Sequence, residues 1–155
     1  MDNKYLIDFY KIAFLSLKQR VAGGCANLAK PTLIISIIDA IDSKAITDNK
    51  IVYSTIKPIY EDLLKSVQTE ATPLKYPFYH LSSEDFWHLE WKKSTEKIPK
   101  VPSDKFMREN LEYASLDNAL WDLLQDSTNR LFYKDSIVSY YKMLRDWQGG
   151  GSDLL

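Results

Sequence analysis

Apolar residues recur at helical spacing in two segments near the N-terminus. The first segment predicts a helix over Tyr5–Arg20, because its apolar residues lie three or four positions apart: Phe9, Ile12, Ala13 and Leu17. The second predicts a helix from Pro31 to about Ser43, with Pro31 in the first turn, where its missing N–H costs no hydrogen bond. This helix is apolar nearly all round, which is typical of the buried centre of a domain: Leu33, Ile34, Ile35, Ile37, Ile38 and Ile41.

The middle of the chain predicts short strands around a third helix. Lys50–Tyr53 has the pattern of a short strand, and Thr55 is a candidate N-cap for the helix that follows. Two aromatic segments, Phe78–Leu81 and Phe86–Trp91, then predict an antiparallel hairpin that turns at residues 82–85.

The last third of the chain predicts three more helices. Ser103, Ser115 and Ser127 each precede an apolar periodic segment and are candidate N-caps, so the helices would begin near Asp104, Leu116 and Thr128. We therefore expect a mostly helical α+β fold in one domain over residues 1–147, with a winged-helix-like core and a small antiparallel β-hairpin. Residues 148–155 contain three consecutive glycines and predict a flexible tail.

The composition indicates the cellular compartment of the protein but not its function. The chain has 155 residues, 45% hydrophobic and 13% aromatic, with a net charge of −1. A single cysteine, Cys25, allows no internal disulfide, which fits a reducing compartment. The longest apolar run, Leu33–Ile41, is too short to span a bilayer, and the first residues lack the pattern of a signal peptide. We expect a cytoplasmic protein.

The sequence contains no complete constellation for catalysis or for a cofactor. In the predicted hairpin, His80 and His88 fall on opposite faces and cannot share a metal ion. An HNH-type nuclease needs a cluster of histidine and asparagine ligands that the chain lacks, and the E-x-K at Glu90–Lys92 has no aspartate on a neighbouring strand. We therefore expect a non-enzymatic protein without a cofactor or a metal site.

Charge is distributed unevenly along the chain. Residues 86–108 hold six basic and three acidic side chains, a net charge of +3, whereas residues 109–155 have a net charge of −4. A local basic segment can attract a phosphate backbone even when the total charge is near zero. The same lysines also suit an ordinary solvated loop, and the residues alone leave both interpretations open.

The pair Tyr76-Pro77 stands just before the first aromatic segment. Together the two side chains can present a flat apolar surface to a weakly hydrated group, a sugar or a base. They can equally close the edge of the core, and sequence physics alone favours that interpretation.

Four motifs in order resemble a known family. They are Lys30-Pro31-x-Leu33-Ile34-Ile35, Asn49-x-Ile51, Tyr76-Pro77-Phe78-Tyr79-His80-Leu81 and Phe86-Trp87-His88-Leu89. This pattern resembles the N-terminal recognition domain of bacterial HNH restriction endonucleases, a group that includes the sulfur-binding domain of phosphorothioate-dependent enzymes. The resemblance extends from about Lys30 to Tyr141.

The resemblance implies a DNA-binding module in which Tyr76 and Pro77 match a pair that lines a shallow cavity for the phosphate sulfur. It also implies that Lys30 lies near the DNA backbone. The chain departs from the family at Asn27-Leu28-Ala29, where sulfur-binding members carry basic or polar residues, and it ends in the glycine-rich tail where an HNH domain would begin.

These observations favour a non-catalytic module that binds double-stranded DNA, plain or modified, in a bacterial restriction or anti-phage system. We expect a nuclease or another defence subunit as its partner and no contact with a membrane. The expected DNA-binding residues are Lys30, Lys75, Tyr76, Pro77, His80, Lys92, Lys93 and Lys97. The alternative is a scaffold subunit of a multi-protein defence complex, which the acidic C-terminal helices and the many Tyr and Trp residues favour.

Overall fold

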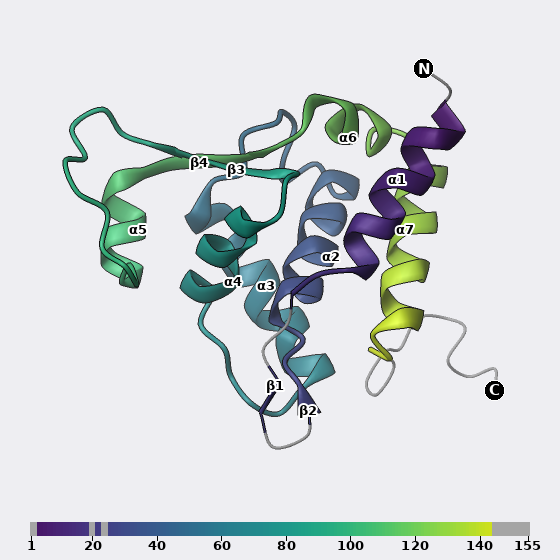
Figure 1. Cartoon of the computed structure of the whole chain (residues 1–155), viewed down its shortest axis with the longest axis horizontal. Coiled ribbons are helices and arrows are strands. Elements are labelled where there is room, and N and C mark those ends of the chain that lie inside the picture. Colours follow the sequence, from purple (N-terminus) through teal and green to yellow (C-terminus); the bar gives the residue numbers. More distant parts are fainter. Residues whose placement is uncertain (1–2, 19–20, 23–24, 144–155) are drawn as a thin grey trace.

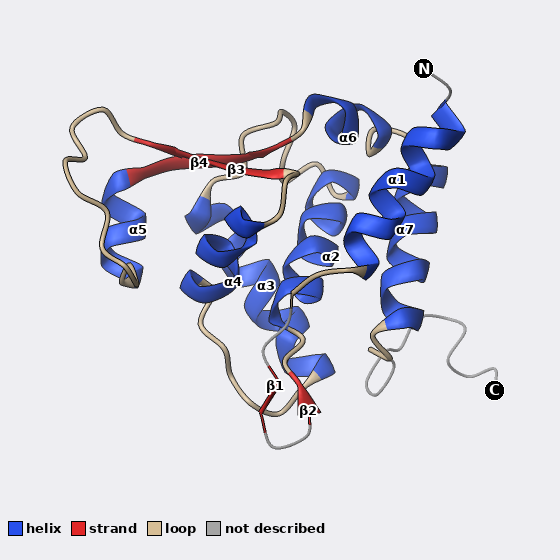
Figure 2. Cartoon of the chain, in the orientation of Figure 1, coloured by secondary structure: helices blue, strands red, loops and turns tan. Residues whose placement is uncertain are grey.

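The computed structural model of the chain describes residues 3–18, 21, 22 and 25–143. Figures 1 and 2 show a mostly helical α+β arrangement. The elements in chain order are α1 (Asn3–Leu15), β1 (Val21–Ala22), β2 (Cys25–Ala26), α2 (Ala29–Asp42), α3 (Tyr53–Val67), α4 (Lys75–His80), the 3-10 helix η1 (Leu81–Ser83), β3 (Trp87–Trp91), α5 (Asp104–Asn110), β4 (Leu111–Leu116), α6 (Asn118–Leu123) and α7 (Ser127–Tyr140).

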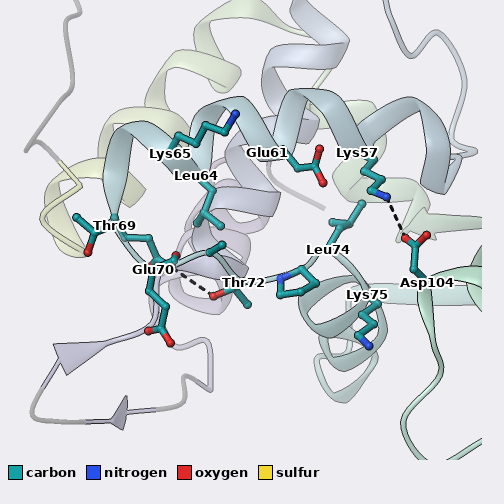
Figure 3. Close-up of a pocket in the computed structure, with 13 residues that line it drawn as sticks. Lys57, Glu61, Leu64, Lys65, Thr69, Glu70, Thr72, Leu74, Lys75 and Asp104 are labelled. Atoms are coloured by element: carbon teal, nitrogen blue, oxygen red, sulfur yellow. Dashed lines mark hydrogen bonds and ion pairs between the residues drawn. The ribbon is translucent and has the colours of Figure 1, made fainter.

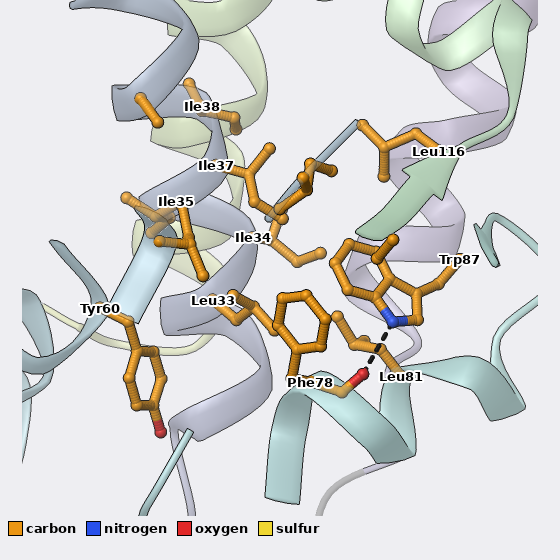
Figure 4. Packing of buried hydrophobic residues seen from close by; sticks show 14 of the residues in the cluster. Leu33, Ile34, Ile35, Ile37, Ile38, Tyr60, Phe78, Leu81, Trp87 and Leu116 are labelled. Atoms are coloured by element: carbon orange, nitrogen blue, oxygen red, sulfur yellow. Dashed lines mark hydrogen bonds between the residues drawn. The ribbon is translucent and has the colours of Figure 1, made fainter. Parts of the chain in front are cut away.

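Helix α2 is the centre of the fold, as its all-round apolar sequence predicts. It packs against α3, α4 and α7, and nearly all of its side chains are buried. Figure 4 shows its isoleucines and Leu33 meeting Tyr60, Phe78 and Trp87 from the surrounding elements. Two ion pairs also join α7 to the C-terminal half of α2: Lys134 to Asp39 at 2.8 Å and Arg130 to Asp42 at 3.0 Å.

The predicted strand at Phe78–Leu81 is wrong, because this segment is helical in α4 and η1. Helical spacing buries Leu74, Phe78 and Leu81 against the core. Pro77 lies in the first turn of α4, where its missing N–H would have had no intrahelical partner. A hydrogen bond also fixes α4 to β3, because Trp87 Nε1 donates to the Phe78 carbonyl at 2.8 Å.

The predicted strand at Phe86–Trp91 is present as β3, but its antiparallel partner is β4 and not the segment Phe78–Leu81. β3 pairs with β4, with Trp87 opposite Leu116 and Leu89 opposite Ala114, and the ladder is irregular between Glu90 and Trp91. The helix expected from about Asp104 is present as α5, but it ends at Asn110, and the strand β4 that follows it was not predicted. The register argument that separated His80 from His88 therefore fails, because His80 is on a helix and His88 is on β3.

The predicted strand at Lys50–Tyr53 is reduced to one bridge, Ile51 with Ala114, and Tyr53 already begins α3. The side chain of Asn49 holds this segment against the end of β4, because it accepts from the Leu116 N–H and donates to the Leu116 carbonyl. The winged-helix description is not confirmed.

Helix starts were predicted with mixed success. Ser103 is an N-cap, and its hydroxyl accepts from the Phe106 N–H at 3.0 Å. Ser115 lies within β4, and α7 is capped by Asp126 rather than by Ser127. The expected tail over residues 148–155 lies outside the described residues.

The apolar face predicted for the first helix is buried only in part, since Leu17 is buried and Ala13 packs against the core. Tyr10, Phe14 and Leu17 are in the core, whereas Phe9 is 51% and Ile12 is 65% exposed. Figure 1 shows α1 beside α7, with which it packs. None of the helices in the described part of the chain has the length and apolar character needed to cross a membrane.

Candidate functional site

Helix α4 turns one side to the core and the other to solvent. Phe78 and Pro77 are buried, while Tyr76 is 39% exposed and His80 is also exposed. The Lys75 ammonium lies over the Tyr76 ring, 5.0 Å from its centroid. The Tyr76-Pro77 pair is therefore divided, with Pro77 closing the edge of the core, as favoured from the residues alone, and Tyr76 at the surface.

Lys30 meets α4 at the N-terminal end of α2. It is half-buried, and burial lowers the pKa of its ammonium, with a further decrease from Lys18 and an opposing effect of Glu84. The pKa of His80 is lowered first by burial and then by the charge of Lys30, so a cation already lies beside this imidazole. An anion bound here would favour the charged form of both groups.

Four of the predicted residues lie at one surface, which we call the α4 face: Lys30, Lys75, Tyr76 and His80. The fifth, Pro77, is buried at the edge of the core. The residues just before Lys30 add no cation to the α4 face. The Asn27 side chain accepts from the Ala29 N–H and donates to the Thr72 hydroxyl, both at 2.8 Å, and the Leu28 N–H donates to Gln68.

The other three predicted residues, Lys92, Lys93 and Lys97, lie on the segment after β3, which we call the lysine loop (residues 92–97). All three are exposed, and none forms an ion pair within the described part of the chain. The loop is held at its start, because the Lys92 N–H donates to the carbonyl of Asn110 at 2.8 Å. Its ammonium groups are therefore available to an anionic partner.

One ring contact joins α4 to the residue that precedes the lysine loop. Tyr79 of α4 lies 6.5 Å from Trp91, the last residue of β3, measured between ring centroids. The helix α4 and the end of β3 are thus neighbours, although Figure 1 shows the loop extending beyond the sheet toward α5.

An open groove of about 730 Å³ lies on the Lys75 side of α4, between α3 and the segment that leads into α4. Figure 3 shows Lys57, Glu61 and Lys65 along its α3 wall. Of the predicted binding residues, only Lys75 lines this groove. The sequence did not indicate it, because its walls come from the outer face of α3 and from residues 68–74, which carry no motif.

Asp104 closes one end of the groove within a network of donors. It accepts from Arg108 Nε at 2.9 Å, from the Tyr53 hydroxyl at 2.8 Å and from Lys57 Nζ at 3.2 Å. These bonds, that of Arg108 above all, lower the pKa of Asp104 to about 2. Its negative charge is thus balanced within the protein, which reduces repulsion of an anionic partner.

A second polar cluster was missed from the sequence. The carboxylate of Asp117 bonds His88 Nε2 at 2.7 Å and accepts from the Tyr10 hydroxyl at 2.8 Å, so it ties α1 to β3. We assign it a structural role. Among the described residues, no three histidine, cysteine or acidic side chains gather where they could hold a metal ion.

Comparison with known proteins gives a structural match without a sequence match. Neither a scan against protein-family models nor a search of curated protein sequences finds a match. Among solved structures, the sulfur-binding domain of ScoMcrA complexed with phosphorothioated DNA superposes with a TM-score of 0.71 at 15% identity, covering 87% of this chain and 88% of that one. The chain has the fold of a sulfur-binding domain.

Two further structures share the sulfur-binding-domain fold. The sulfur-binding domain of SprMcrA, also complexed with phosphorothioated DNA, matches with a TM-score of 0.67 at 15% identity and covers 94% of this chain and 96% of that one. The type IV phosphorothioation-dependent restriction endonuclease ScoMcrA matches with a TM-score of 0.68 at 16% identity. There the fold covers 94% of this chain but only 33% of the enzyme.

Proposed function

We propose that the chain is a non-catalytic DNA-binding module of a bacterial restriction or anti-phage system, active in the cytoplasm. The observation that carries the proposal is the fold, which it shares over most of its length with two domains whose structures contain phosphorothioated DNA. The α4 face supports it, because this face combines two lysines, a histidine and an exposed tyrosine on one surface.

In this proposal the α4 face and the lysine loop contact the DNA backbone. Phosphate contacts from lysine, histidine and tyrosine give orientation and most of the affinity, whereas sequence is read at base edges. Lys30 and His80 suit one phosphate because the helices that carry them, α2 and α4, pack together. Lys92, Lys93 and Lys97 suit phosphates farther along the duplex.

The α4 face also suits a modified phosphate, in which sulfur replaces one oxygen. Tyr76 is exposed on the α4 face and supplies an apolar contact there, which suits a phosphate whose oxygen is replaced by the less hydrated sulfur, while Pro77 is buried beneath the face. Residues 27–29 supply no second cation, and the Asn27 side chain accepts from the Ala29 N–H and donates to the Thr72 hydroxyl. We therefore propose that the module binds unmodified backbone as well, with the sulfur adding to the affinity through Tyr76.

The nuclease that would act with this module is proposed to be a separate domain or subunit. The ScoMcrA endonuclease supports such an arrangement, since this fold makes up about a third of that chain.

Duplex binding is tested by fluorescence anisotropy with a labelled 16-base-pair DNA, plain and phosphorothioated, at several salt concentrations. We expect micromolar or tighter binding to both, with an affinity that falls steeply with salt, by about 0.9 log units per phosphate contact for each tenfold increase in salt. Absence of salt-dependent binding to either duplex at micromolar protein would refute the proposal.

A second candidate function is protein interaction, and exposed apolar side chains favour it. Tyr5, Phe9 and Ile12 form a stripe on the outer face of α1, with exposures of 58%, 51% and 65%. Leu131 and Tyr140 of α7 are 60% and 59% exposed. These side chains lie on α1 and α7 and not on α4 (Figure 1), so a partner subunit that covers them can leave Lys75, Tyr76 and His80 open to DNA.

A further inference from the structure

Four aromatic rings form a row that begins on the α4 face and continues across the sheet to α5. The ring centroids of His80 and Tyr79 are 5.3 Å apart, those of Tyr79 and Trp91 are 6.5 Å apart, and those of Trp91 and Phe106 are 5.8 Å apart. The row joins three elements, α4, β3 and α5, and we call it the aromatic row.

The polar groups of the aromatic row are not used by the protein. In the described residues, neither the Tyr79 hydroxyl nor Trp91 Nε1 has a hydrogen-bond partner, and neither belongs to the atoms buried without one. Structural aromatics elsewhere in the chain behave differently, since Trp87 donates to Phe78 and Tyr53 donates to Asp104. Solvent therefore reaches both donors of the row, which leaves them available to a ligand.

Lysines without ion pairs surround the far half of the aromatic row. Lys92 and Lys93 follow Trp91 directly, and Lys105 precedes Phe106. All three are exposed, and within the described part of the chain none of them forms an ion pair. Aromatic faces beside uncompensated lysines are the combination that binds single-stranded nucleic acid.

The orientation of the rings favours an unstacked strand over a duplex. The neighbouring rings of the row are inclined to one another by 75°, 59° and 55°, so they do not form a series of parallel faces that the regularly stacked bases of a duplex could match. Unpaired bases can separate and rest on Phe, Tyr, Trp and His side chains.

We propose that the aromatic row binds unpaired nucleotides next to the duplex held by the α4 face. This inference rests on the proposed function and specifies its ligand as DNA with a junction between paired and unpaired strands. Such DNA includes ends with an overhang and sites that are locally opened.

The test compares a labelled 16-base-pair blunt duplex with the same duplex carrying a six-nucleotide single-stranded overhang, by anisotropy at fixed salt. We expect the overhang to increase the affinity about tenfold. Trp91→Ala should remove that gain and keep the affinity for the blunt duplex. Trp121→Ala is the matched control, because this half-buried tryptophan is on α6, at the other end of β4 from α5, and should keep the gain.

The outcomes separate the two proposals. The aromatic row does not bind unpaired nucleotides if the blunt duplex binds and the overhang adds no affinity, or if Trp91→Ala keeps the added affinity. The proposed function stands in both cases. If Trp91→Ala fails to fold, as judged by its thermal melt, Phe106→Ala decides in the same way. Binding of the overhang DNA without the blunt duplex would support the row and overturn the proposed duplex site, and binding of neither DNA would overturn both.

Discussion

Replacing Phe78 by alanine is expected to destabilise the protein by about 3–5 kcal/mol, because the change leaves a cavity beneath α4. Phe78 is fully buried, and its ring meets Tyr53 and Trp87 edge to face, each with a centroid distance of 5.1 Å. A loss of this size is a large part of the stability of a single domain, about 5–15 kcal/mol. Urea denaturation followed by circular dichroism measures it.

Matched variants within α4 distinguish the helix from the strand that the sequence suggested. Tyr76→Ala and His80→Ala should each change the stability by less than about 1 kcal/mol, because both side chains are at the surface. In a strand, residues 76, 78 and 80 would share one face and would respond alike. Equal losses at these three positions would therefore contradict the helical α4.

Reversing the charge of Lys92 and Lys93 together, to glutamate, is expected to weaken duplex binding by about one to two orders of magnitude at about 0.1 M salt. The two ammonium groups are exposed and form no ion pair with any residue that the structure describes, and the backbone bond from Lys92 to Asn110 fixes where the loop begins. The loss should be the same for unrelated DNA sequences, since phosphate contacts carry no sequence information. The slope of log affinity against log salt should fall by about two.

The control for this variant is Lys44→Glu/Lys142→Glu, which makes the same change in net charge at exposed positions beyond the C-terminal ends of α2 and α7. It should lower the affinity less than threefold. Equal losses in the two double variants would mean that only total charge matters, and the lysine loop would then have no specific place at the DNA.

Long helices were predictable because their apolar pattern is itself the cause of their burial. The all-round apolar sequence of α2 leaves no polar face, so the helix has to be central, and the structure places it there. The helix α3 was also predicted, although it begins two residues before Thr55, the expected N-cap. α1 shows the limit of such patterns, because two apolar faces compete and the sequence does not tell which one meets the core.

Short elements could not be predicted because tertiary contacts decide them. α4 has six residues, too few for a helical period to show, and its Tyr, Phe and His favour strands by propensity. Packing of Phe78 under Trp87 overrides that preference. β4 was also not predicted, because its partner β3 lies twenty residues earlier and no short turn between the two strands indicates that they pair.

The α4 face was predicted from a resemblance in motifs and not from physics, since residues 30 and 75–80 are far apart in the sequence. The contact between α2 and α4 brings them together. The aromatic row and the groove were not predicted, because Tyr79, Trp91 and Phe106 belong to three elements whose arrangement depends on the β3–β4 pairing.

The central claim is that the α4 face, with the lysine loop, binds DNA. The most direct test is a titration of the isotope-labelled 18.0 kDa chain with duplex DNA, followed by amide chemical shifts in NMR spectra. We predict that the largest shifts fall at residues 28–32, 75–81 and 91–97, at micromolar DNA and reversibly with salt. Shifts confined to α1 and α7, or an unchanged spectrum at saturating DNA, would contradict the claim.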